Sequence, residues 1–150
     1  MNAIVRLLTG CCMSAMSLLC LAQPASPAND LILIRTSAKS PNEVSDAIKA
    51  YVESKKWVYG GALTVKPKQG DVIMVKLCIP QVGAILWPVG LQLSALLPCG
   101  NVGIYMNQGK TEISMLHPRY MQTLYPHPEV ERAVVVSTPL LIEMLDSVAK

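Results

Sequence analysis

The feature that most constrains this chain is an uncharged run from Leu77 to Gly109. No Asp, Glu, Lys, Arg or His occurs in it, and it carries two cysteines, Cys78 and Cys99. An apolar stretch of this length cannot stay in water without aggregating, so it must be buried in a fold, covered by a partner or placed in a membrane. We therefore expect any function of the protein to involve this run.

Composition indicates one folded domain. Apolar residues make up 51% and charged residues 15% of the 150-residue chain, which excludes an intrinsically disordered protein. A chain of this length can bury a sizeable core. The net charge of +3 is weak, aromatic residues are sparse and no basic cluster occurs. The sequence therefore predicts no nucleic-acid partner.

The N-terminus has the features of an export signal. Arg6 supplies a positive charge, Leu7 to Leu21 form an apolar segment, and Cys20-Leu21-Ala22 is a small-x-small cleavage site. The alternatives are a lipoprotein signal acylated at Cys11 and an uncleaved membrane anchor. We expect a secretory signal peptide at residues 1–22, a spacer at 23–30, and one domain at 31–150 that is periplasmic or secreted.

A capping box predicts the start of the first helix. Ser40 can accept a hydrogen bond from the backbone of Glu43, whose side chain can return to Ser40, and Pro41 suits the first turn. Apolar residues then recur at helical spacing from Val44 to Val52, and the charged residues mostly fall elsewhere. We expect an amphipathic helix that lies on a sheet.

The strand-like segments are arranged mainly as hairpins. Gly60-Gly61 indicates a bulge in the first of them, and Pro139 is expected to kink or divide the last helix. The order of elements favours an α+β fold with a mostly antiparallel sheet and helices on one face. The expected strands are Leu31 to Thr36, Trp57 to Lys66, Val72 to Cys78, Asn101 to Met106 and Thr111 to Leu116, and the last helix runs from about Glu129 to Val148.

The segment from Val82 to Leu97 is apolar on all sides. If it is helical, it must be buried or lie at a partner's surface, and Pro88 should break or kink it. Polar residues and prolines within it weaken the alternative of a membrane span, so we expect no span after removal of the signal. The sequence predicts a buried surface, a dimer surface or a site for a small apolar ligand, formed by Leu86, Trp87, Leu91 and Leu93.

The two cysteines of the mature chain admit three interpretations. If the strands on either side of the apolar segment are antiparallel neighbours, Cys78 and Cys99 reach the same edge of the sheet, where a disulfide can form. An even number of cysteines in an oxidising compartment favours such a structural disulfide. The alternatives are a reversible dithiol or soft-metal ligand pair, and two buried, inert thiols.

The histidines do not add a metal site to this picture. His117 and His127 each precede a proline, and neither forms a short spacing with another histidine or a cysteine that is typical of metal ligands. We therefore expect no metal and no cofactor, and we expect both histidines to be turn residues.

The motifs around the apolar run resemble those of the domain-of-unknown-function 302 family. They are Cys78-Ile79-Pro80, Leu97-Pro98-Cys99, the Val-Gly-Ile-Tyr of Val102 to Tyr105, and Gly109-Lys110-Thr111 before a strand that ends at Pro118. The resemblance implies a TATA-binding-protein-like strand-helix-four-strand-helix domain, often paired as a homodimer, without an established activity. This chain differs at His117, where Asn is more common in the family, and at Gly100, where a basic residue often occurs.

Two functions follow from these observations. The first is an exported domain, not an enzyme, that associates with itself or binds a small apolar ligand. The second is a thiol-based redox or sulfur-handling protein that uses Cys78 and Cys99.

Overall fold

The computed structural model describes residues 30–97 and 101–150. Cys99, the predicted signal peptide and the predicted spacer up to residue 29 lie outside the described residues. The helices and strands, with η1 a 3-10 helix, are β1 (Ile32–Ser37), α1 (Pro41–Ser54), β2 (Val58–Val65), β3 (Val72–Cys78), α2 (Pro80–Leu86), η1 (Leu91–Ala95), β4 (Asn101–Asn107), β5 (Lys110–Leu116), α3 (Tyr120–Leu124) and α4 (Pro128–Ala149).

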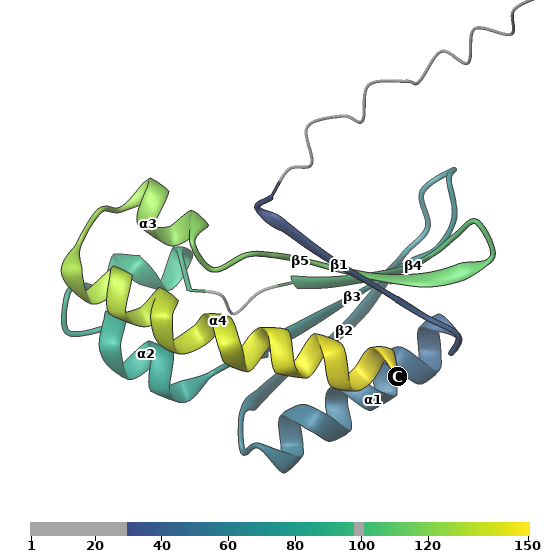
Figure 1. The fold of residues 1–150 in the computed structure, drawn as a ribbon, viewed down its shortest axis with the longest axis horizontal. Coiled ribbons are helices and arrows are strands. Elements are labelled where there is room, and N and C mark those ends of the chain that lie inside the picture. The colour runs from purple at the N-terminus through teal and green to yellow at the C-terminus, as the bar shows by residue number, and fades with distance from the viewer. Residues whose placement is uncertain (1–29, 98–100) are drawn as a thin grey trace, which may run out of the picture.

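The five strands form one antiparallel sheet in the order β1-β5-β4-β3-β2. β2 and β3 form one hairpin and β4 and β5 another, while β1 pairs with β5 at the far edge. The long helix α4 and the helix α1 lie on the same side of this sheet (Figure 1). The predicted α+β fold with an antiparallel sheet and helices on one face is therefore confirmed.

Local sequence signals define the ends of α1 and of the second hairpin. The Ser40 backbone N–H donates to Glu43 Oε2 at 2.8 Å, and Ser40 Oγ accepts from the Glu43 backbone at 3.4 Å, which confirms the capping box. Between β4 and β5, Gln108 and Gly109 both have positive φ, at 48° and 79°. A tight turn with two positive φ angles matches the twist of the strands it joins.

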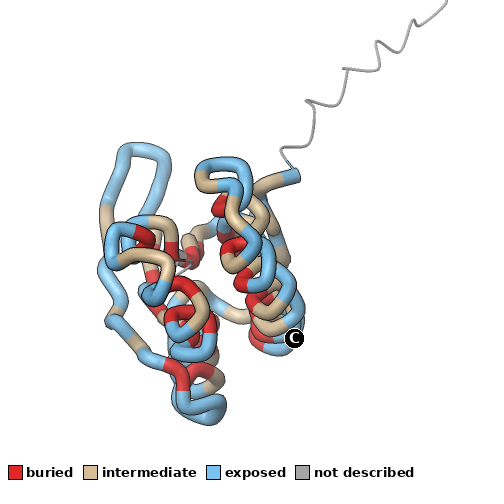
Figure 2. Tube along the Cα trace, turned by 90° about the vertical axis from the view of Figure 1, so that its left-hand side faces the viewer, coloured by how far each residue is buried: buried red, intermediate tan, exposed pale blue. Residues whose placement is uncertain are grey.

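The core lies between the sheet and the helices. Alternate residues of the strands point into it, and Figure 2 shows buried positions that recur along the helices. Each fully buried aliphatic side chain contributes about 1.5–3 kcal/mol to folding. The largest side chains of this core include Ile48, Leu77, Ile104, Ile113, Leu141, Met144 and Leu145.

The apolar segment does not form one helix. It is divided into α2 and η1 by the turn that contains Pro88, as the sequence predicted. α4, by contrast, continues through Pro139, so the alternative that this proline divides the last helix is wrong. Ser137 and Thr138 donate their hydroxyls to the carbonyls of Ala133 and Val134 at 2.7 Å, within the turn of helix that precedes the proline. Among the described residues, no helix has the length and apolar character needed to cross a membrane.

Candidate functional site

The predicted apolar surface is split between the core and the exterior. Leu86 and Leu93 are each 1% exposed and belong to the core, whereas Trp87 is 47% and Leu91 76% exposed. The Trp87 ring lies against Gly83, where a side chain of any size would meet it at 3.1 Å. The exposed part of this surface is therefore small, and it lies at the end of α2 and on η1.

Cys78 is the last residue of β3 and is half-buried. Its sulfur is disulfide-bonded and does not titrate. β3 and β4 are antiparallel neighbours, the condition under which the sequence brings Cys78 and Cys99 to one edge of the sheet. Because Cys99 lies outside the described residues, its pairing with Cys78 stays a prediction.

The sheet has a second face, opposite the helices, which we call the open face. Its outward positions form three rows across the strands, because antiparallel pairing sets their Cα atoms side by side. From β2 to β1, the first row is Val65, Val72, Tyr105, Glu112 and Thr36; the second is Leu63, Met74, Gly103, Ser114 and Ile34; the third is Gly61, Lys76 and Asn101, followed by Leu116 and Ile32.

The open face is unusually apolar for a surface that faces water. Leu63 is 60% exposed, Ile34 47% and Leu116 46%, and they come from three different strands. Val58 and Ile32 are also exposed on this face. Large exposed apolar patches mark interaction sites.

A shallow hollow of about 340 Å³ lies at the centre of the open face. Gly103 lies among its lining residues, and a Cβ atom there would approach Ser114 Oγ to 2.9 Å. Met74, Tyr105 and Leu116 also line the hollow. A glycine at this position therefore keeps the middle of the sheet open to a partner.

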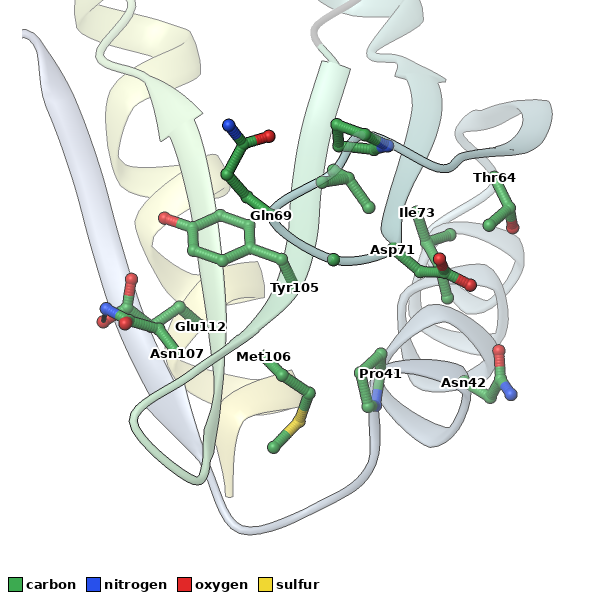
Figure 3. Close-up of a pocket in the computed structure, with 13 residues that line it drawn as sticks. Pro41, Asn42, Thr64, Gln69, Asp71, Ile73, Tyr105, Met106, Asn107 and Glu112 are labelled. Atoms are coloured by element: carbon green, nitrogen blue, oxygen red, sulfur yellow. Dashed lines mark hydrogen bonds between the residues drawn. The ribbon is translucent and has the colours of Figure 1, made fainter.

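A larger hollow of about 610 Å³ lies at the end of the sheet, next to the β2–β3 turn. Figure 3 shows Glu112 and Asn107 on one side of it and Pro41, from the start of α1, on the other. Asn107 Nδ2 donates to Glu112 Oε1 at 2.8 Å. Burial and the hydrogen bond to Glu112 raise the pKa of Tyr105 above its ordinary value. These polar groups are therefore engaged mainly with one another.

Both histidines are local backbone acceptors. Nδ1 of His117 accepts from the backbone N–H of Arg119, and Nδ1 of His127 accepts from that of Glu129, each at 3.1 Å. His127 thereby caps the N-terminus of α4. Within the described residues, no group of three or more His, Cys, Asp or Glu side chains is placed to hold a metal ion.

The role of His117 predicts a pH-dependent stability. Burial and the positive charge of Arg119 lower the pKa of His117 below its ordinary value of 6.5, so the unfolded chain takes up this proton more readily. The contribution of this site is therefore complete above about pH 6.5 and is lost as the pH falls below it. His117→Asn keeps an acceptor for the Arg119 N–H but does not titrate. We expect its melting temperature to fall less than that of the wild type between about pH 7.5 and about pH 5. An equal fall in both proteins would contradict this role.

The fold can be compared with solved structures. No family model and no curated protein matches the sequence. A crystal structure of an uncharacterized conserved protein from Bacillus stearothermophilus, described as DUF302, superposes with a TM-score of 0.68 and covers 80% of this chain and 98% of its own. This chain has the DUF302 fold. The two sequences are 17% identical, so the likeness to the DUF302 protein is one of fold.

Sequence reasoning missed the open face, although a signal was present. In β1, Ile32 and Ile34 point to the open face, while Leu33 between them packs against the core. Strands that are apolar at consecutive positions are typical of sheets covered on both faces. This pattern, more than the uncharged run itself, indicates a surface that needs a partner.

Proposed function

We propose that this chain is an exported domain, not an enzyme, that pairs with a second copy of itself through the open face. The observation that carries the proposal is the apolar surface of a sheet face that the helices of the described chain leave uncovered. An antiparallel sheet with one face in water normally carries polar residues on that face. Here Ile34, Leu63 and Leu116 are exposed on it instead.

Export is supported by the N-terminal sequence. Arg6, the apolar segment from Leu7 to Leu21 and the small residues at Cys20 and Ala22 have the order of a secretory signal peptide. We therefore place the mature domain, from Gln23 onward, in the periplasm or outside the cell.

The size of the open face suits a protein partner. Five strands spaced by about 4.8 Å, each about seven residues long, give a flat area on the order of 600 Å². This is the same order as the roughly 800 Å² that each partner buries in a standard interface.

A second copy fits the open face better than a small apolar ligand does. The central hollow takes in Met74, Tyr105 and Leu116, but Ile34 and Leu63 are not among its lining residues. A ligand in the hollow would leave these two side chains exposed, whereas a flat partner covers them. A second copy presents the same apolar rows, which is the condition for a two-fold symmetric interface.

A charge in the middle row should separate the two copies. In Met74→Lys, the ammonium group can reach water in a single chain but lies against the partner in a dimer. We expect the dimer dissociation constant to rise by roughly a hundredfold or more, since an unpaired buried charge costs several kcal/mol. Sedimentation equilibrium measures this constant.

Leu91→Lys is the matched control for this variant. Leu91 is 76% exposed on η1 and belongs to the apolar surface predicted from the sequence. We expect Leu91→Lys to associate like the wild type. If Leu91→Lys dissociates while Met74→Lys remains paired, the interface lies at α2 and η1 and the open face is not the contact surface.

A further inference from the structure

Two charged residues, Lys76 and Glu112, lie within the three rows of the open face. Their places are related through Gly103. Lys76 is one strand from Gly103 toward β2 and one row further along the sheet, and Glu112 is one strand toward β1 and one row in the opposite direction. The two charges therefore lie on one diagonal, on either side of the centre of the face.

Neither charge has an ionic partner within the part of the chain that the structure describes. The stem of Lys76 lies beside the bulge, where a Cβ at Gly60 would be 3.1 Å from Lys76 Cγ. Glu112 accepts a neutral hydrogen bond from Asn107 at 2.8 Å. Covering the face with a partner would take both charges out of water, which is costly unless each finds an opposite charge.

The charges discriminate between the ways in which two open faces can meet. A two-fold axis parallel to the strands would set Lys76 against the partner's Leu116, and an axis across the strands would set it against the partner's Val72. Both arrangements leave Lys76 buried without an opposite charge. An axis along the other diagonal exchanges the places of Lys76 and Glu112, so that each charge meets its opposite twice in the dimer.

Resting on the proposed self-association, we infer that the two copies cross face to face, with Lys76 of each paired to the partner's Glu112 and with Gly103 at the centre. The strands of the two sheets then cross nearly at right angles, one of the two standard modes of sheet packing. Met74 meets the partner's Tyr105, a sulfur–aromatic contact. Leu116 and Val72 each meet the same residue of the partner.

A charge exchange tests this arrangement. Lys76→Glu sets two like-charge pairs in the dimer, and Glu112→Lys does the same. We expect each single variant to raise the dimer dissociation constant by about tenfold or more. The double variant Lys76→Glu/Glu112→Lys restores opposite charges, and we expect its dissociation constant to return to within about threefold of the wild type.

Two controls on the helical side accompany the exchange. Lys49→Glu on α1 and Glu131→Lys on α4 change the net charge by the same amounts, and we expect them to leave association unchanged. The neutral variants Lys76→Gln and Glu112→Gln repeat the test without charge repulsion, in case a reversed charge impairs folding. In that pair, we expect the two substitutions to weaken the dimer less together than the sum of their single effects.

The outcomes separate the crossed arrangement from the proposed function. A charge-exchanged double variant that is as weak as the sum of its single variants overturns the Lys76–Glu112 pairing while self-association stands. A wild type that remains a single chain at every concentration overturns the proposed function itself.

Discussion

Cys78→Ser and Cys99→Ser are each expected to lower the free energy of unfolding of the mature protein by about 2–4 kcal/mol. Lys76 pairs with Asn101 between β3 and β4, and each cysteine lies two residues beyond that pair in the sequence. This spacing suits a disulfide between neighbouring strands. It would close a loop of 22 residues, for which the chain-entropy model gives about 3.4 kcal/mol.

The double variant identifies the cause of the loss. If the two sulfurs form one cross-link, Cys78→Ser/Cys99→Ser should be no less stable than either single variant, because the same bond is missing in all three. Denaturant unfolding of the oxidised proteins measures these differences. Additive losses, together with two free thiols in the oxidised wild type, would indicate two separately packed cysteines.

The same proteins test the thiol-based alternative. A redox pair predicts small changes in stability, a disulfide that mild reductant opens, and one thiol that is alkylated at neutral pH as a thiolate. A structural cross-link predicts resistance to mild reductant. Thiol counting before and after reduction distinguishes the two functions.

The second large effect is expected within the apolar segment, where the structure assigns opposite environments to neighbouring residues. Leu86→Ala and Leu93→Ala should each destabilise the protein by about 2–5 kcal/mol, because both side chains are fully buried and leave cavities. Leu91→Ala, between them in the sequence, should change stability by less than about 0.5 kcal/mol. Thermal or denaturant unfolding of the three variants checks this contrast.

Equal losses at Leu91 and Leu93 would contradict the assignment of these two residues to surface and core. Trp87→Ala is informative beside them. Its ring is half-exposed and packs on Gly83, so a loss between those of Leu91 and Leu93 is expected.

Much of the fold could be predicted from local signals. The capping box at Ser40 and Glu43 marks the start of α1, and the turn at Gln108 and Gly109 fixes the register of β4 and β5. These features depend on residues close together in the sequence. The division at Pro88 likewise follows from the backbone chemistry of proline itself.

The site depends on long-range pairing and could be predicted only in part. Nothing near Leu86 or Leu91 in the sequence reveals that one side chain faces the core and the other faces water, since both belong to the same uncharged run. Sequence spacing likewise does not show that Lys76 and Glu112 flank Gly103, because that arrangement requires the register of β3, β4 and β5. The continuity of α4 through Pro139 also depends on its packing within the fold.

Sedimentation equilibrium of the mature chain, beginning at Gln23, tests the self-association of this domain most directly. If the open face pairs two copies, the wild type should show twice the mass of the chain at micromolar concentration, and Met74→Lys should show the mass of one chain under the same conditions. A wild type that sediments as a single chain at all concentrations, with Ile34, Leu63 and Leu116 exposed to water, would contradict the proposal.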